Sequence, residues 1–348
     1  MIDIKIGNKR IGNSRPCFVI AEAGVNHNGD VNLAKKLIEA AKRAGADAVK
    51  FQTFRAENVA TANAGKANYQ KETAGDGESQ LEMLKNLELT GSDFQELFDY
   101  ARKKAIVFLS SPFDKTSVDL LDELGITAFK IPSGEITNLP LLKYIAQKKK
   151  PIILSTGMST LSEVENALAI IRNEGVEDIV LLHCVSCYPA DMKDMNLRAM
   201  ETLRSAFKLP VGLSDHTLGI AIPIAAVALG ARVIEKHFTL DKGLPGPDHG
   251  ASLEPDDLKH MVKAIRDVEK ALGDGIKRPA EDEKENKELA RRSLVAKVYI
   301  AEGTMLTEEM LDIKRPAGGI EPKHIGLVIG RRTRKDIAKD SPIRWEEV

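Results

Sequence analysis

The sequence predicts an α/β fold: a (β/α)8 TIM barrel followed by a small C-terminal domain that is mostly β. The first observation is a repeat in which a short apolar run ends in polar residues and is followed by an amphipathic helical pattern. The repeat occurs eight times between Phe18 and Phe238. Eight such units over about 250 residues are what a closed parallel barrel needs. The second observation is a change after residue 293, where short β-like pieces alternate with Gly-rich turns.

The expected strands are short and rich in Val, Ile or Phe. They cover residues 18–23, 48–53, 107–111, 128–133, 152–156, 179–184, 211–215 and 233–238. Helical patterns lie between them, with Asp, Asn or Ser near several starts and Gly near several ends. Examples are residues 31–44, 92–104, 161–172 and 220–229. The connection 55–90 is too long for the pattern and has no clear apolar stripe, which is typical of a lid or a substrate-contacting loop.

Three segments follow from this pattern. We expect a barrel domain at residues 1–272, a charged linker at 273–292 and a second domain at 293–348. The β-like pieces of the second domain are residues 293–300, 313–315, 328 and 331–333. A domain this small is near the lower limit of what folds alone, so we expect it to dock on a barrel, its own or a partner's.

The composition indicates a cytoplasmic enzyme. The 348 residues carry 50 basic and 51 acidic side chains, a net charge of −1. Such a balance does not indicate a nucleic-acid or membrane-surface partner. No long apolar span occurs, and residues 1–8 alternate in the manner of a hairpin strand rather than a signal peptide.

The three cysteines do not predict redox or zinc chemistry. Cys17 opens the first strand, and Cys184 and Cys187 form a CxxC motif at the end of the sixth. Tyr188 and Pro189 follow the motif instead of a helix start, and there is no second cysteine pair. Packing at the end of a strand is the expected role.

Polar residues end the strands, where a barrel places its active site. Glu22 ends the first strand, and a carboxylate there is costly unless a polar group meets it. Lys50 and Gln52 share one face of the second strand, and Lys130 lies in the fourth. Two lysines facing one mouth repel unless an anion lies between them, so we expect a phosphate or carboxylate ligand. Hydroxyl donors stand at other strand ends: Ser110, Ser111, Ser155, Thr156 and Ser214.

Two histidines indicate a metal site. His216 ends the seventh strand and His237 the eighth, so their imidazoles are expected on adjacent strands within reach of one ion. Two histidines with open positions fit a divalent metal that water or substrate completes, rather than a closed structural zinc. The turn after the eighth strand can bring Asp248 and His249 over the same mouth.

These residues resemble the sialic acid synthase family over essentially the whole chain. The motifs are Glu22-Ala-Gly-Val-Asn-His-Asn-Gly29, Lys50-Phe-Gln52, Ser214-Asp-His-Thr217, Glu235-Lys-His237 and Gly246-Pro-Asp-His249. The C-terminal domain is similar to the family's SAF module, which is related to type III antifreeze protein. It matches through Lys314-Arg-Pro316, Gly319-Ile320 and Ile329-Gly-Arg331.

The resemblance implies condensation of phosphoenolpyruvate with an N-acetylated hexosamine, giving a nine-carbon 2-keto acid and free phosphate by C–O cleavage. N-acetylmannosamine is the expected acceptor and N-acetylneuraminate the expected product. The alternative is N,N'-diacetyllegionaminate synthesis from 2,4-diacetamido-2,4,6-trideoxymannose. The form of the first motif looks more like neuraminate and legionaminate synthases than pseudaminate synthases.

The resemblance also implies roles for residues. His216 and His237 would hold Mn²⁺ or Mg²⁺. Phosphoenolpyruvate would contact Lys50, Lys130, Ser133, Ser155, Ser186 and Ser214. Ser110 is a further candidate for substrate binding because of its place at the end of the third strand. Glu135 is the candidate for handling the proton of the attacking water, with Gln52 helping to position it. Glu22 and Asp248 would bind sugar hydroxyls, and Tyr188 and Asn68 are further candidates for sugar contacts. Arg315 of the small domain would reach the N-acetyl group across a domain-swapped homodimer.

Three other functions compete with this interpretation. A Schiff-base aldolase would use a barrel lysine, but it would not need the histidine pair. A metal-dependent hydrolase usually gathers more metal ligands than two histidines. A non-catalytic polysaccharide-assembly or binding protein is the third, although every position expected to be catalytic carries a suitable residue.

Overall fold

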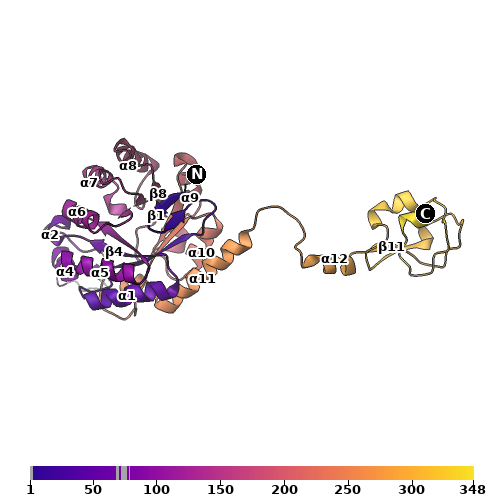
Figure 1. Cartoon of the computed structure of the whole chain (residues 1–348), viewed down its shortest axis with the longest axis horizontal. Coiled ribbons are helices and arrows are strands. Elements are labelled where there is room, and N and C mark those ends of the chain that lie inside the picture. Colours follow the sequence, from indigo (N-terminus) through magenta and orange to yellow (C-terminus); the bar gives the residue numbers. More distant parts are fainter. Residues whose placement is uncertain (1–2, 68–69, 72–76, 78) are drawn as a thin grey trace. The chain divides into compact units, whose positions relative to one another are not determined.

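The protein divides into two compact units, Met1–Gly273 and Asp274–Val348 (Figure 1). The computed structural model describes residues 3–67, 70–71, 77 and 79–348. Asn68 therefore lies outside the described residues, and its expected sugar contact stays a prediction.

Unit 1 is built on eight parallel strands, as the sequence predicts. They are β3 (Phe18–Gly24), β4 (Ala48–Thr53), β5 (Val107–Pro112), β6 (Phe129–Ile131), β7 (Ile152–Ser155), β8 (Ile179–Cys184), β9 (Val211–Asp215) and β10 (Val233–His237). Their order in the sheet is β5-β4-β3-β10-β9-β8-β7-β6. The sheet ends at β5 and β6 in the part of the chain that the structure describes. These two strands lie side by side, so the barrel is nearly closed.

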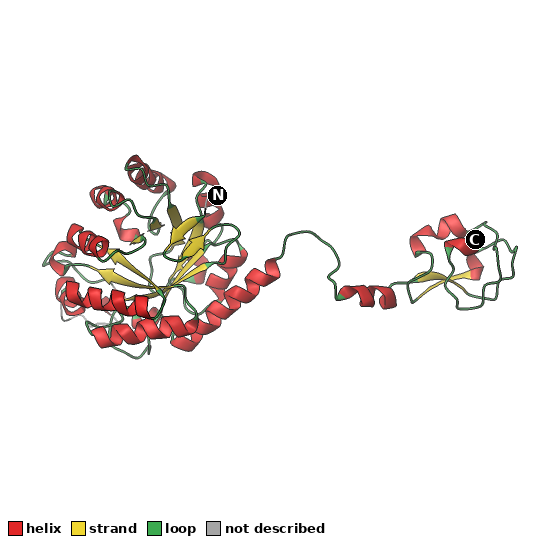
Figure 2. Ribbon diagram, viewed as in Figure 1, coloured by secondary structure: helices red, strands yellow, loops and turns green. Residues whose placement is uncertain are grey.

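Helices surround the strands on the outside of the barrel (Figure 2). They are α1 (Val31–Ala44), α5 (Gly91–Lys103), α6 (Lys115–Glu123), α7 (Leu139–Ala146), α8 (Leu161–Asn173), α9 (Ala199–Phe207), α10 (Ala221–Ala228) and α11 (Pro255–Leu272). In α1 the Asp30 side chain accepts from the Asn32 amide at the start, and Gly45 ends the helix at φ 85°. An N-cap carboxylate and a left-handed C-terminal glycine are the signals that the sequence offered.

The fourth strand is shorter than expected. Residues 128–133 were predicted, but β6 ends at Ile131, and a short 3₁₀ helix, Ser133–Glu135, follows Pro132. Proline has no amide hydrogen for the sheet ladder, so it ends the strand. The face that a side chain takes beyond Pro132 is therefore no longer set by strand alternation.

The barrel interior is apolar below its carboxyl end. Inward-facing side chains pack there from every strand except β6, which Ala128 precedes, and β9, whose Gly212 lies in close contact with Val233 and Leu182. A hairpin of β1 (Ile4–Ile6) and β2 (Lys9–Ile11) adds three isoleucines to this cluster. The cluster is Ile4, Ile6, Ile11, Phe18, Ile20, Ala48, Leu109, Ala128, Ile153, Val180, Leu182 and Val233. It supports the polar layer above it.

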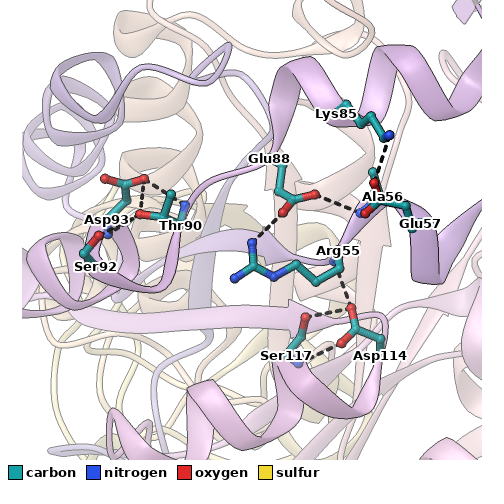
Figure 3. A network of polar contacts seen from close by, with 10 residues as sticks. All are labelled: Arg55, Ala56, Glu57, Lys85, Glu88, Thr90, Ser92, Asp93, Asp114 and Ser117. Atoms are coloured by element: carbon teal, nitrogen blue, oxygen red, sulfur yellow. Dashed lines mark hydrogen bonds and ion pairs between the residues drawn. The ribbon is translucent and has the colours of Figure 1, made fainter.

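In its described residues the long connection 55–90 forms the short helices α2 (Ala56–Val59) and α4 (Gln80–Leu87), which the sequence did not indicate. Its two ends are joined by the Glu88 carboxylate, which accepts from Arg55 Nη1 at 2.5 Å and from the Ala56 amide at 2.9 Å. The Arg55 amide also donates to Asp114 at 2.9 Å (Figure 3). These bonds fix where the loop leaves and rejoins the barrel.

Unit 2 has its own small apolar core. It contains α12 (Glu283–Ala290), β11 (Ser293–Ala296), β12 (Leu311–Lys314) and α13 (Ile325–Val328), with 3₁₀ turns at Glu308–Met310, Pro322–His324 and Trp345–Glu347. The strands pair antiparallel. The β-like interpretation of Val328 is wrong, because this residue ends a helical turn and packs into the core. Arg315 is exposed on this unit.

Within the described residues, every helix is too short or too polar to cross a bilayer.

Candidate active site

A cavity of about 290 Å³ opens at the carboxyl ends of the strands. It forms because the inward face of each strand changes from apolar to polar at its last residues, directly above the apolar cluster. Lys50 and Gln52 both line it, as the alternation of β4 predicts. The cavity brings together these residues that the sequence singled out: Glu22, Lys50, Gln52, Lys130, Ser133, Ser155, Ser186, Tyr188, Ser214, His216 and His237.

Two expected site residues lie away from the cavity wall, and a third, Asp248, is not part of the wall but lies beside His237. Ser110 is fully buried on the opposite face of β5, where its hydroxyl bonds that of Thr53 at 2.6 Å. Its neighbour Ser111 lines the cavity instead. Glu135 lies in the 3₁₀ turn beyond Pro132, and its carboxylate accepts from Asn138 at 2.7 Å. The structure therefore corrects the placement of Ser110 and of Glu135.

Four buried charges form the floor of the cavity. Lys50 Nζ lies 2.9 Å from Glu22 Oε2 and 3.7 Å from Glu235 Oε2. Lys130 Nζ lies 3.2 Å from Glu235 Oε1, which also accepts from the Ser214 hydroxyl at 3.0 Å. Glu235 thus lies between the two lysines that were expected to repel each other. An unpaired buried charge is far more costly than a paired one, so this carboxylate keeps both ammonium groups in place.

The pKa values of the two carboxyl groups shift in opposite directions. Burial opposes the ionisation of Glu235, but Lys130 and Lys50 outweigh it and lower the pKa of this group to about 2. Burial raises the pKa of Glu22 to about 7, against the charge of Lys50. Glu235 is therefore a permanent anion, whereas Glu22 can exchange a proton near neutral pH.

Hydroxyl groups gather on the Lys130 side of the cavity. The Gly157 amide donates to Ser133 Oγ at 2.9 Å. A Cβ at Gly157 would lie 2.8 Å from that oxygen and 2.3 Å from Ser186 Oγ, so only glycine leaves room for the two hydroxyls. Ser155 Oγ is buried without a hydrogen-bond partner among the described residues. Unpaired donors beside a lysine are suited to bind an anion.

The two histidines lie on adjacent strands, with ring centroids 5.4 Å apart. His216 Nδ1 donates to the Val185 carbonyl at 2.7 Å, so Nε2 is the nitrogen that can bind a metal in the neutral ring. Burial opposes the charged ring, but contacts with Cys184 and Val185 outweigh it and raise the pKa of His216. Burial lowers the pKa of His237 well below its usual range, which keeps this ring neutral. The Tyr188 ring packs against both, at 4.0 Å from His216 and 5.6 Å from His237.

This pair fits a divalent metal ion. His237 Nδ1 is buried and has no hydrogen-bond partner among the described residues. An imidazole binds a metal through an unprotonated ring nitrogen, and two imidazoles side by side can share one ion. In the described part of the chain, no group of three or more His, Cys, Asp or Glu residues is arranged to hold a metal. The remaining positions would therefore fall to water or substrate.

Asp248 lies at the histidine end of the cavity, where its Oδ2 is 3.8 Å from His237 Nδ1. A Cβ placed on Gly24 would lie 3.5 Å from this oxygen, 3.3 Å from Glu22 Oε1 and 3.5 Å from Gln52 Nε2. The three polar side chains therefore converge around Gly24. Burial raises the pKa of Asp248 to about 6.

Cys184 and Glu235 line the cavity although no role in the site was expected for them, and Ser111 lines it where Ser110 was expected to bind the substrate. Strand alternation could have found all of them. Glu235 has the same parity as His237 on β10, and Ser111 is the register partner of Gln52. Cys184 shares the inward face of β8 with Leu182, and its thiol lies 3.8 Å from His216 Nδ1. All three cysteines are free.

The comparisons with known proteins agree on one family. Residues 37–277 match the model of the NeuB family, and residues 291–348 match that of the SAF domain. The N,N'-diacetyllegionaminic acid synthase of Campylobacter jejuni is 55% identical over 94% of this chain and 98% of that protein. The enzyme of the same name from Legionella pneumophila is 48% identical over 98% and 97%.

A solved structure with a similar fold is the N-acetylneuraminic acid (sialic acid) synthetase of Leptospira borgpetersenii in complex with citrate. It is 38% identical, with a TM-score of 0.73, and the match covers 82% of this chain and 95% of that one.

Proposed function

Because the chain belongs to the NeuB family and carries an SAF domain, we propose that it condenses phosphoenolpyruvate with an N-acetylated amino sugar. Water is the third reactant, and the products are a nine-carbon 2-keto sugar acid and phosphate. The observation that carries the proposal is one cavity that holds two lysines, a set of hydroxyls and a pair of histidines. These are the groups that a trianionic enol phosphate and a sugar aldehyde require.

For the acceptor, the comparisons favour the alternative over the sugar that was expected first. N-acetylmannosamine was expected, but the relatives at 55% and 48% identity are both named N,N'-diacetyllegionaminic acid synthases. The N-acetylneuraminic acid synthetase described above is only 38% identical. We therefore assign the acceptor as 2,4-diacetamido-2,4,6-trideoxymannose and the product as N,N'-diacetyllegionaminate.

Phosphoenolpyruvate would lie between the two lysines. Lys50 and Lys130 supply the charge, and Glu235 keeps both in place before the substrate arrives. The two ammonium groups and a set of hydroxyl groups would then bind the phosphate and carboxylate oxygens. The hydroxyl groups are those of Ser111, Ser133, Ser155, Ser186 and Ser214. Groups already arranged around the anion do not have to reorganise when charge moves during the reaction.

His216 and His237 would hold Mn²⁺ or Mg²⁺ beside the acceptor. Such an ion supplies Lewis-acid polarisation of the sugar aldehyde when it is bound. The protein orients the two imidazoles through Val185 and Tyr188. A buried ion pair also holds β10 against β9 next to both histidines. In it, Lys236 Nζ donates to Asp215 Oδ2 at 2.5 Å.

Proton transfer is assigned to Glu22 rather than to Glu135. Attack of the enol carbon on the aldehyde leaves positive charge at C2 of phosphoenolpyruvate, and water adds there. A base must take the proton of that water before phosphate leaves with its bridging oxygen. Glu22 is in the cavity with a pKa raised by burial to about 7, whereas Glu135 lies outside. A base with a pKa near the working pH is the most effective.

Phosphate release from phosphoenolpyruvate tests the proposed function. We expect release with Mn²⁺ to require a sugar and to be faster with 2,4-diacetamido-2,4,6-trideoxymannose than with N-acetylmannosamine. The reaction without sugar is the control. A preference for N-acetylmannosamine would overturn the acceptor assignment, and no sugar-dependent release with either would overturn the synthase.

Arg315→Ala is expected to impair use of the sugar more than use of phosphoenolpyruvate. The side chain is exposed on unit 2, and we assign it to the N-acetyl group of a sugar in the barrel of a second copy. Loss of one charged hydrogen bond costs about 1.5–3 kcal/mol, so the KM for the sugar should rise roughly 10- to 100-fold. Unchanged sugar kinetics would refute this role.

A mixing experiment tests the proposed domain-swapped dimer. Arg315→Ala and His237→Ala chains would each be defective alone. When they are co-expressed, a mixed dimer would contain one intact site, with the barrel of one chain and Arg315 of the other. Random pairing should restore about a quarter of wild-type activity. No recovery, with mixed dimers demonstrated, would contradict the shared site.

A further inference from the structure

The Asp248 carboxylate is positioned in an unusual way for a buried acid. It lies at the histidine end of the cavity and is 6% exposed. The described residues supply no hydrogen bond to its carboxylate oxygens, and its Oδ2 lies 3.8 Å from Nδ1 of the neutral His237 ring. A buried carboxylate without donors is costly, which is expected where a ligand supplies them. The side chain must then be held through its main chain.

One hydrogen-bonded chain fixes the main chain of Asp248. The Ser252 hydroxyl donates to the Asp248 carbonyl at 2.6 Å. The same hydroxyl accepts from Asn26 Nδ2 at 2.9 Å, and Nδ2 also donates to the Phe238 carbonyl at 2.9 Å. Asn26, in the turn after β3, thus joins both ends of the loop that follows β10. Asn26 and Ser252 are each 1% exposed, so water does not compete for these bonds.

A second chain holds the same loop through His249. Asn28 Nδ2 donates to the Pro245 carbonyl at 2.8 Å, so Asn28 Oδ1 is left to accept from His249 Nε2 at 3.1 Å. Burial lowers the pKa of His249 and keeps the ring neutral. Its Nδ1 therefore accepts from the Thr239 hydroxyl at 2.7 Å.

The loop also needs a glycine between the two chains. A Cβ on Gly246 would lie 2.8 Å from the His249 ring and 2.9 Å from Asn28 Oδ1. The backbone there has φ +145°, which disfavours other residues. The close contact of histidine and asparagine therefore depends on Gly246.

We propose that Asn26, Asn28, His249 and Ser252 form a clamp that fastens residues 239–252 to the β3–α1 turn and thereby positions the Asp248 carboxylate for the acceptor sugar. These four are positioning residues, because they act through Asp248 and do not line the cavity. The existence of the clamp is inferred from the hydrogen bonds alone. Its effect on binding of the acceptor sugar rests on the proposed function.

Two variants test the clamp, with a matched control. Ser252→Ala removes the hydroxyl that bonds Asp248, and Asn28→Asp removes the amide donor to Pro245 while keeping the side-chain shape. Tyr144→Phe is the control, since it also loses a hydroxyl bond, to Asp119 at 2.8 Å, but on the outer helices α6 and α7. We expect faster amide hydrogen exchange in residues 244–253 for the first two variants only. Unchanged exchange in both would overturn the clamp.

Kinetics then test positioning. Loss of one buried hydrogen bond is expected to raise the sugar KM of Ser252→Ala about tenfold, with little change in the KM for phosphoenolpyruvate. In an Asp248→Ala background, Ser252→Ala should have no further effect, because it acts through that carboxylate. The positioning role would be overturned if Ser252→Ala raised the sugar KM equally in the wild-type and Asp248→Ala backgrounds. It would also be overturned if Ser252→Ala made amide hydrogen exchange faster but left the sugar KM unchanged. If the wild-type protein shows no sugar-dependent turnover, the proposed function fails and hydrogen exchange alone decides the clamp.

Discussion

His237→Ala is expected to abolish synthase turnover and to remove the dependence on divalent metal. The pair of imidazoles at the ends of β9 and β10 becomes a single ligand, which cannot hold an ion at an otherwise open site. Lewis-acid stabilisation is worth several kcal/mol, so kcat should fall by about 10³-fold or more. Mn²⁺ binding, measured by calorimetry or electron paramagnetic resonance, should weaken in parallel.

His183 provides the matched control for this experiment. It lies on the neighbouring strand β8, on the opposite face from the inward-facing Leu182. Its Nε2 bonds the Met195 carbonyl at 2.7 Å. His183→Gln should therefore retain Mn²⁺ binding and turnover. Turnover of the wild-type enzyme in excess EDTA, or undiminished Mn²⁺ binding by His237→Ala, would contradict the metal assignment.

Strand alternation explains which parts of the site could be predicted from sequence. Lys50 and His237 come from the inward faces of regular strands, where the period of two fixes the side-chain direction. The same rule, applied through the register of β4 and β5, points to Ser111 instead of Ser110, because Ser110 is paired with the outward-facing Phe51. Ser110 was therefore assigned to the wrong face of its strand.

Residues beyond the strands were less predictable for a physical reason. Pro132 ends β6, so strand parity no longer applied to Glu135 in the turn that follows. The hydrogen bond between Asn26 and Ser252 joins two residues that are 226 positions apart in the sequence. Such a bond depends on the closure of the whole barrel. A turn sequence alone indicates that asparagine favours the turn, but it does not identify the partner.

The charged floor explains why Glu22 and Glu235 have different roles although both are buried. Glu235 contacts two lysines and the Ser214 hydroxyl, which stabilise its ionised form. Among the described residues Glu22 forms an ion pair with Lys50 alone, and burial together with the Glu235 charge raises its pKa. Two titratable groups whose surroundings push their pKa values apart are a common basis for separating structural charge from proton transfer.

Glu22→Gln is expected to lower kcat by about 10²- to 10⁴-fold, the usual contribution of a general base. The amide keeps the size of the side chain but accepts no proton. In the wild-type enzyme the base is the ionised form, so with a pKa of about 7 the value of kcat/KM should fall as the pH drops below neutrality. That acid limb should disappear in Glu22→Gln. Binding of phosphoenolpyruvate should persist, because Lys50 retains Glu235 as a counter-charge at 3.7 Å.

Glu135→Gln separates this assignment from the one that the sequence favoured. Glu135 lies outside the cavity and bonds Asn138, so its replacement should leave both kcat and the pH profile nearly unchanged. If Glu135→Gln removes the acid limb and Glu22→Gln keeps it, the proton is handled in the turn after β6 and not on the cavity floor. If each variant loses activity but keeps the limb, the titrating group lies elsewhere, and Asp248, with a pKa raised by burial to about 6, is the next carboxylate to replace.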